Sequence, residues 1–279
     1  MQFISHISTP WRIYLVSCVA LTSWALTSVV SNLLHYAEIS TDLAKEIAPF
    51  QNSSTTIPGA LAGGHYLAVE LGEIDAEFLT DLVLTEDENF YQHNGVDFLA
   101  TMAAIQRYIQ VKYLGVVFEA FQNQKLFGGS TITQQLVKNL LQHKNRVIAI
   151  KFKEILIALM VEQKLAERFT KKKLKAIILK KYLEIFYVTK NFYGLKYAAY
   201  LFLNKDTRVL PLSSRIVLLA VINRPSVMNR KAPVRKKKLY RKIIRRLVAC
   251  NRIHDDASLV VKIAPGFSSR LKRLADMYK

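Results

Sequence analysis

The amino-acid sequence predicts a mainly α-helical protein with one transmembrane helix near its N-terminus. From Asp75 onward, apolar residues recur at spacings of three and four, and the 279 residues include only ten Gly and seven Pro. Residues 13–34 contain no charged side chain. A hydrophobic content of 51% excludes an extended disordered tail, and two widely separated Cys exclude a disulfide scaffold. The net charge of +19 indicates an anionic partner, with nucleic acid and a membrane surface as the first candidates.

The uncharged segment 13–34 is predicted to be an uncleaved membrane anchor. Its 22 residues are enough for a helix that crosses the hydrocarbon layer, and Trp11 and Tyr36 lie where amphipathic rings favour the interface. Arg12 precedes the segment and no Lys or Arg follows until Lys45, which places the N-terminus in the cytoplasm and the bulk of the chain outside. The alternatives are a buried core helix and a cleaved signal peptide, whose apolar region would be shorter, about 7–15 residues.

The rest of the chain divides by composition. Residues 38–64 are polar with Ser and Gly clusters, which is typical of a linker, and residues 65–71 are predicted to form a short strand. Nothing after Ser226 indicates a second catalytic domain. We therefore expect five parts: a short cytoplasmic segment 1–12, the anchor 13–34, a linker and entry segment 35–70, a helical domain 71–230 and a basic helical tail 231–279.

Glu86 is the first candidate for chemistry. Residues 79–97 are predicted to include a helix that ends at Asn94-Gly95, and helical periodicity puts Glu86 on an apolar face with Phe90. A carboxylate among apolar groups is a suitable general base near neutral pH. The alternative is a structural Glu that caps a helix or pairs with a buried cation.

Residues 128–135, with the sequence GGSTITQQ, form the motif richest in information. The glycines permit a positive φ angle or a close backbone approach, and Thr131 and Gln134 have the spacing of a capping box, which predicts the start of a helix. Free N–H groups, hydroxyls and amides in its first turn would form a polar receptor for sugar or phosphate, with Lys138 and Arg146 farther along. The alternative is an ordinary capped helix with a solvated Lys.

Glu154 is the second candidate carboxylate. The helix predicted over residues 147–167 is apolar on most sides, which predicts a central, buried element. Lys151 lies one turn before Glu154, and on spacing alone a buried structural ion pair is the more common case. Two carboxylates on separate apolar helix faces, with cations between them in sequence, are nonetheless the composition of a site for sugar chemistry.

Together these segments resemble the peptidoglycan glycosyltransferase family, which polymerises lipid II into glycan strands. The resemblance covers about residues 70–230. Its first motif is similar to Glu86-Asp87-x-x-Phe90-x-x-His93-x-Gly95-x-Asp97, and its second to GGSTITQQ followed by Lys138-Asn139. Parts of the third, fourth and fifth motifs match Lys151-x-x-Glu154, then Tyr182-Leu183, Tyr193-Gly194 and Ala198-Ala199, and finally Pro225-Ser226.

The sequence also departs from the family's motifs. The third motif usually begins with Arg, where this chain has Ile150. Glu184 stands where Asn is usual in the fourth, and the fifth usually carries a Glu near Ser214. Both carboxylate positions are kept, so the departures bear on substrate affinity or on the acceptor more than on the reaction. The other changed positions of the fourth motif are Thr189, Asn191 and Lys196.

The resemblance implies a lysozyme-like helical glycosyltransferase domain in its monofunctional form, beside a smaller membrane-embedded region. It implies two catalytic residues. Glu86 would be the general base that deprotonates the acceptor's 4-hydroxyl, which attacks the anomeric carbon of the growing chain and displaces undecaprenyl diphosphate. Glu154 would help to position the donor diphosphate. The implied substrate-binding residues are Asp87, Phe90, His93, Ser130, Thr131, Gln134, Gln135, Lys138, Asn139, Arg146 and Lys151.

The resemblance also implies partners and a location. The expected partners are lipid II, the nascent glycan strand, membrane lipids and other cell wall synthesis proteins, with no nucleic acid. The expected location is the bacterial cytoplasmic (inner) membrane, with the catalytic domain on the periplasmic side. The sequence shows no metal-ligand signature and no required cofactor, although Mg²⁺ or Mn²⁺ assists some members. The ten Lys and Arg of residues 230–246 are expected to lie against anionic lipid headgroups.

Three rival functions remain at this point. A lysozyme-like enzyme would cleave glycan instead of making it, but it would not need cations for a diphosphate. A non-catalytic membrane scaffold of the same family is compatible with the altered third and fourth motifs. A basic nucleic-acid-binding protein would need a recognisable binding module, which the sequence lacks.

Overall fold

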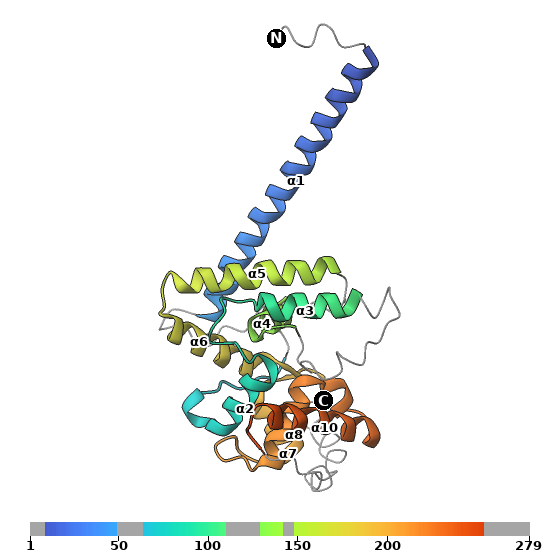
Figure 1. The fold of residues 1–279 in the computed structure, drawn as a ribbon. Helices are drawn as coiled ribbons and strands as arrows, with labels where there is room; N and C mark the ends of the chain where they lie inside the picture. The colour runs from blue at the N-terminus through green and yellow to red at the C-terminus, as the bar shows by residue number, and fades with distance from the viewer. Residues whose placement is uncertain (1–8, 49–63, 110–128, 142–147, 254–279) are drawn as a thin grey trace.

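The computed structural model describes residues 9–48, 64–109, 129–141 and 148–253, and these are mostly α-helical. A long N-terminal helix projects from a domain in which an upper group of helices lies above a lower one (Figure 1). The predicted mainly α class is confirmed.

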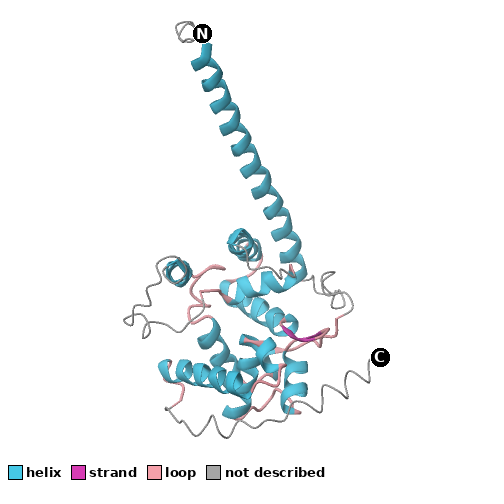
Figure 2. Cartoon of the chain, turned by 90° about the vertical axis from the view of Figure 1, so that its right-hand side faces the viewer, coloured by secondary structure: helices cyan, strands magenta, loops and turns pink. Residues whose placement is uncertain are grey.

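The long helix α1 (Thr9–Ile47) projects for most of its length and packs against α5 only near its C-terminal end (Figures 1 and 2). Leu43 and Ile47 at this end are buried, whereas Leu21, Trp24 and Leu26 are all more than half exposed. In the described part of the chain, no helix combines the length and the hydropathy needed to cross a membrane. The helix also continues through residues 38–47, so this part of the predicted linker is helical.

The upper group contains α3 (Phe98–Ile109), α4 (Ile132–Leu140), α5 (Ile148–Ala166) and α6 (Lys171–Ile185), and α4 packs on both α5 and α6. The prediction of a helix over 147–167 is confirmed, but the prediction that it is central is wrong. One face of α5 is buried through Ile157, Ala158 and Val161, whereas Phe152 on another face is 61% exposed. Helices α1, α4 and α6 contact α5, but they leave Phe152 open to solvent.

The lower group surrounds α8 (Leu212–Asn223), in which residues 216–222 are all buried. Around it lie α2 (Ala76–Glu86), α7 (Leu195–Leu203), α9 (Pro225–Met228) and α10 (Pro233–Ala249). Apolar residues all round a helix are typical of a central element. Helix α10 packs on α2 and α8 through buried Leu239, Ile243 and Leu247, so the basic segment contributes to the core of the domain.

The extended structure is small. Strands β1 (Tyr187–Thr189) and β2 (Phe192–Tyr193) form an antiparallel hairpin. Of the strand predicted over 65–71, only His65 pairs, in a single bridge to Phe192, and a 3-10 helix follows at Leu71–Glu73. Because β2 has only two residues, it offers no edge along which a longer strand can pair.

Candidate active site

The first carboxylate, Glu86, is the last residue of α2. The prediction that this helix continues to Asn94 is wrong, because Asp87 leaves the helical conformation with φ −157°. The carboxylate of Asp87 accepts a hydrogen bond from the Ile132 backbone N–H at the start of α4, at 2.9 Å. It also lies 3.0 Å from Nε2 of His93. A carboxylate is stabilised at a helix N-terminus, and this interaction pulls the chain away from the axis of α2.

Two side-chain amides hold Glu86. Gln135 donates from Nε2 to Oε2 at 3.2 Å, and Asn223 donates from Nδ2 to Oε1 at 2.9 Å. The hydroxyl of Tyr182 donates to Oε1 of Gln135 at 2.9 Å, which orients the amide so that its NH₂ group faces Glu86. Burial, with the charges of Glu86 and Asp87, raises the pKa of Tyr182 well above its usual value, so the hydroxyl stays a donor. The carboxylate is therefore fixed in direction by groups from α4 and α8.

Two cations of α10 lie near Glu86. Arg246 is buried, and its Nη1 donates to the Thr85 carbonyl oxygen at 2.5 Å, which satisfies one of the unpaired carbonyls at the end of α2. Burial and Arg246 lower the pKa of the half-buried Lys242, while the charge of Glu86 opposes that shift. Burial also lowers the pKa of Arg246, again opposed by Glu86.

Sequence reasoning missed three groups near Glu86: Asn223, Lys242 and Arg246. Asn223 lies two residues before Pro225-Ser226 of the fifth motif, but nothing in the sequence links it to Glu86. Arg246 follows Leu239 by seven residues and Ile243 by three, so it is a cation on the apolar face of its helix. That signal was present in the sequence.

The helix predicted to begin within GGSTITQQ is α4, and Thr131 is its N-cap, as predicted. The Thr131 hydroxyl accepts from the Gln134 backbone N–H at 3.1 Å and donates to the Gly95 carbonyl oxygen at 2.6 Å. At Gly129, an added Cβ would lie 2.4 Å from the Ala104 Cβ, so only glycine permits this close approach to α3. The preceding Gly128 lies outside the described residues.

The second carboxylate belongs to a cluster centred on Lys151. Its Nζ donates to Ser130 Oγ at 2.9 Å and to Gln134 Oε1 at 3.3 Å, and it lies 3.4 Å from Oε2 of the buried Glu154. Burial lowers the pKa of Lys151, and the positive charge of Lys138 adds to this effect, while Glu154 opposes it. Partial desolvation disfavours the charged ammonium, so a further anion beside it would be stabilising.

The first turn of α4 joins these two clusters. Gln134 contacts the Lys151 cluster and its neighbour Gln135 contacts Glu86, so the two predicted carboxylates lie on either side of one helical turn. Lys138 is exposed one turn after Gln134 and Asn139 is half-buried. Arg146 lies outside the described residues.

Three residues of the first motif face the interior instead. Asp87 and His93 form a pair whose side chains are 3% and 8% exposed, and Phe90 is fully buried. The Lys175 ammonium lies 4.7 Å from the centre of the Phe90 ring and forms a buried ion pair with Glu162 at 2.8 Å. These contacts give the three residues a positioning role, and their contact with substrate stays a prediction.

Two of the departures from the family's motifs, Glu184 and Lys196, do not pair with each other. Glu184 lies 3.8 Å from Lys181 and accepts from the Val69 backbone N–H at 3.4 Å. Lys196 instead pairs with Glu73 at 3.7 Å. Both lie in ion pairs of their own, away from the contacts of the two carboxylates.

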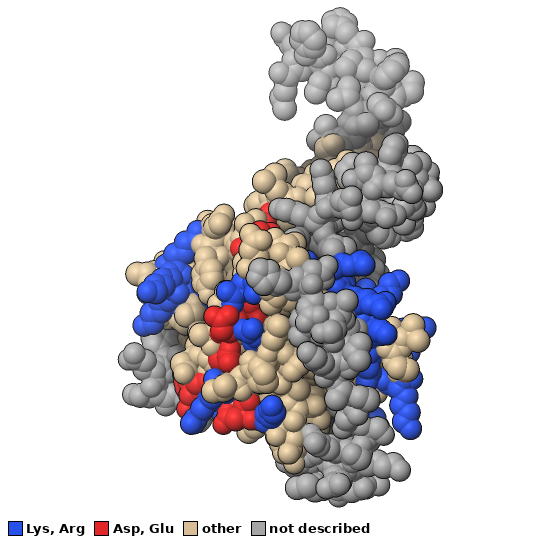
Figure 3. Space-filling model, turned by 60° about the horizontal axis from the view of Figure 1, so that its bottom comes forward, with Lys and Arg blue, Asp and Glu red and all other residues tan. Residues whose placement is uncertain are grey.

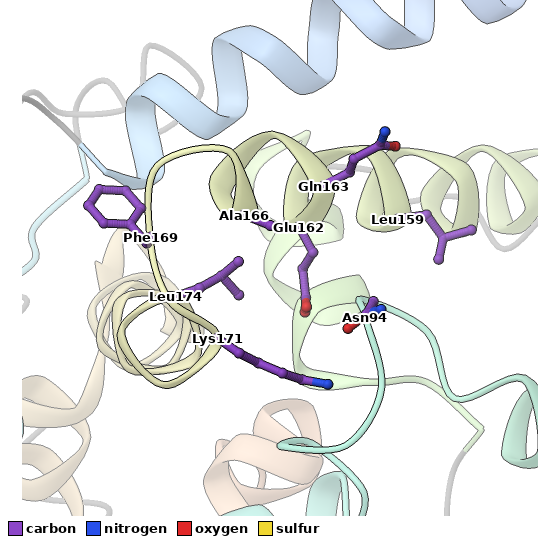
Figure 4. A pocket seen from close by; sticks show the side chains of 8 residues that line it. All are labelled: Asn94, Leu159, Glu162, Gln163, Ala166, Phe169, Lys171 and Leu174. Carbon is purple, nitrogen blue, oxygen red and sulfur yellow. The ribbon is translucent and has the colours of Figure 1, made fainter.

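A cavity of about 520 Å³ lies elsewhere, between α5, the start of α6 and Asn94 (Figure 4). None of the predicted catalytic or substrate-binding residues lines it; its wall consists of Asn94, Leu159, Glu162, Gln163, Ala166, Phe169, Lys171 and Leu174. Among the described residues, no group of three or more His, Cys, Asp or Glu side chains is arranged to hold a metal ion.

The chain is similar to known proteins over its helical domain. A family model described as Transglycosylase matches residues 57–249. The chain is 32% identical over 158 residues to penicillin-binding protein 1F of Bacillus subtilis, covering 57% of this chain and 20% of that protein. It is 34% identical over 162 residues to penicillin-binding protein 1A of Aquifex aeolicus, covering 58% and 20%, and 30% identical over 190 residues to that of Escherichia coli, covering 68% and 20%. The chain thus spans about a fifth of the length of these curated relatives.

The matched range includes both carboxylates, the first turn of α4 and the cations of α10. It also covers well over half of the 279 residues. The chain therefore belongs to the transglycosylase family.

Proposed function

We propose that this protein is a peptidoglycan glycosyltransferase that joins lipid II units into β-1,4-linked glycan strands during bacterial cell wall synthesis. The observation that carries the proposal is the pair of clusters on the first turn of α4. One contains a carboxylate held by amides, and the other contains a partly desolvated ammonium beside hydroxyl and amide groups. The first suits proton abstraction from a sugar hydroxyl, and the second suits binding of a diphosphate leaving group.

In the proposed reaction, Glu86 accepts the proton of the acceptor's 4-hydroxyl as that oxygen attacks the anomeric carbon of the donor. The bond from this carbon to the diphosphate oxygen breaks, and the electron pair leaves with undecaprenyl diphosphate. The hydrogen bonds from Gln135 and Asn223 hold the Glu86 carboxylate in one orientation, so little reorganisation is needed when the proton moves.

Negative charge gathers on the leaving diphosphate. Lys151 is the cation that the described residues place beside the first turn of α4, and Ser130, Gln134 and Glu154 hold its ammonium in position. A positioned cation stabilises developing charge most strongly where water is excluded. Glu154 thus acts through Lys151.

A polymerisation assay with purified lipid II tests the proposal. Glu86→Gln removes the base and is expected to lower strand synthesis by about 10²- to 10⁴-fold. Glu88→Gln is the matched control, because Glu88 is exposed two residues away and should retain the parent rate.

Two other outcomes would replace the proposal. Release of muropeptides from finished wall, with no polymer from lipid II, would indicate a lysozyme-like hydrolase. A biological effect that survives Glu86→Gln would indicate a non-catalytic scaffold of the same family.

We also propose that residues 13–34 anchor the protein in the cytoplasmic membrane, with the domain on the periplasmic side. The support is the uncharged 22-residue segment and the exposed apolar side chains on the projecting part of α1. Exposed apolar residues also occur in the upper group of helices, which lies nearest to that projecting part: Phe98, Leu99 and Met102 on α3, and Phe152 on α5. An apolar patch of this kind is typical of a membrane-facing surface.

Membrane fractionation tests the anchor. The full chain should stay with the membrane after a wash in high salt, and a variant without residues 1–34 should be released in part. Protease added to spheroplasts should degrade the domain. Release of the full chain by salt alone would contradict the proposal.

A further inference from the structure

We propose that the exposed basic face of α10 binds the carboxylate-bearing glycan strand on which the active site works. This inference rests on the proposed function and adds a second contact surface for the polymer. Residues 230–246 contain ten Lys and Arg and no acidic residue.

The structure arranges these cations in a line. Leu239, Ile243 and Leu247 face the core, and α10 carries five exposed cations away from them. Lys237 is one, and the other four recur at spacings of three and four. We call these four the basic stripe: Arg235, Lys238, Arg241 and Arg245. At 1.5 Å per residue, the stripe is about 15 Å long.

The basic stripe has no acidic partner among the described residues. The ion pairs of the described domain involve other Lys and Arg, including Arg215 and Arg252, which hold Glu77 and Asp81 of α2. Like charges three or four residues apart on a helix repel each other and destabilise it. An anion bound along the stripe would remove that repulsion.

The position of the stripe argues against lipid headgroups as this anion. Helix α10 lies at the end of the molecule opposite the projecting part of α1 (Figure 1). Figure 3 brings the lower end forward and shows Lys and Arg gathered on the side where α10 lies. A membrane that holds α1 would therefore be remote from the stripe. The expectation that residues 230–246 lie against anionic lipid is not supported by this arrangement.

The same helix connects the stripe to the active site. Arg246 on this helix donates to the Thr85 carbonyl oxygen, directly before Glu86, and Lys242, one turn earlier, lies next to the stripe in sequence. An anion that extends from the region of Glu86 therefore meets further cations along α10. Peptidoglycan is such an anion, because its peptide stems carry carboxylates at regular intervals along the strand.

Binding to purified, insoluble peptidoglycan sacculi tests this surface directly. The full chain in detergent, carrying Glu86→Gln so that no turnover occurs, is sedimented with sacculi. The stripe variant changes the four positions of the basic stripe to Gln. The control variant removes the same charge at four exposed lysines elsewhere: Lys172, Lys173, Lys190 and Lys205.

The stripe variant should bind sacculi about tenfold more weakly, the combined effect of four exposed ion pairs of ordinary strength. The control variant should bind like the parent, and amidation of the sacculus carboxylates should abolish the difference. Equal binding of the stripe and control variants would overturn the inference. The stripe variant is also tested for binding to phosphatidylglycerol vesicles and to duplex DNA. A loss of binding confined to the vesicles would overturn the inference and indicate lipid, and a loss confined to DNA would overturn it and indicate nucleic acid.

The two proposals fail in different ways. If chains with Glu86 intact make no polymer from lipid II, the glycosyltransferase function fails, whatever the sacculus binding shows. If the stripe variant both polymerises lipid II and binds sacculi normally, the inference about α10 fails alone.

Discussion

Replacement of Arg246 by Met should destabilise the domain and slow its reaction. Arg246 is 3% exposed and donates from Nη1 to the Thr85 carbonyl oxygen at the end of α2. Met has a similar apolar stem but leaves that carbonyl without its charged donor. Since Glu86 follows Thr85 directly, the change acts on the segment that carries the proposed base.

The size of the effect follows from these contacts. A hydrogen bond to a charged group contributes about 1.5–3 kcal/mol, and a cation at a partly buried helix C-terminus contributes up to about 2 kcal/mol. Relief of the buried guanidinium's desolvation offsets part of this sum. We expect a net loss of about 2–3 kcal/mol in the free energy of unfolding. For a domain of about 200 residues, this lowers Tm by about 4–12 °C.

Thermal unfolding followed by circular dichroism measures this loss, and Arg245→Met is the matched control. Arg245 is the preceding residue on α10, but it is exposed, so its replacement should change Tm by no more than about 2 °C. Strand synthesis by Arg246→Met should fall at least about tenfold, because small displacements of a catalytic group are costly. Equal Tm values for the two variants would refute the role assigned to Arg246.

Three further predictions concern other contacts. Asn223→Ala removes one of the two donors to Glu86 and should lower lipid II polymerisation by about 10- to 100-fold, with thermal unfolding as the control for intact folding. Lys175→Met leaves the buried Glu162 without its cation and should lower the free energy of unfolding, measured by urea denaturation, by about 3–5 kcal/mol. Recovery of stability in the double variant Lys175→Met/Glu162→Leu would confirm the cause. An unchanged urea midpoint for the single variant would contradict it. Burial raises the pKa of Glu184 above its ordinary value of 4.5, and this effect exceeds the opposing effects of Lys181 and the Val69 N–H. The ionised group therefore lowers the stability of the fold, and this loss develops as pH rises from 4.5 through the raised pKa of the folded state. Glu184→Gln should therefore have a higher Tm than the parent at pH 7 but not below pH 4.5, and a pH-independent difference would exclude this explanation.

Local signals predicted some elements well. The N-cap at Thr131 and the extent of α5 follow from patterns within one or two helical turns, and both are confirmed. The continuation of α2 beyond Glu86 was wrong because Asp87 binds the start of α4, a contact 45 residues away in sequence. The expected central position of α5 was wrong because an apolar helix surface does not reveal whether protein, solvent or lipid lies against it.

The sequence by itself determined the helical class, the two carboxylates and the motif that begins α4, because helical periodicity and capping act over a few residues. Only the tertiary structure decided what surrounds the proposed base. Asn223 reaches Glu86 across 137 residues, and Arg246 reaches Thr85 across 161. No local pattern encodes such distances, since they depend on how α8 and α10 pack against α2. The same packing decided where the positive charge of α10 lies, because it buries Arg246 beside the end of α2 and leaves the basic stripe exposed.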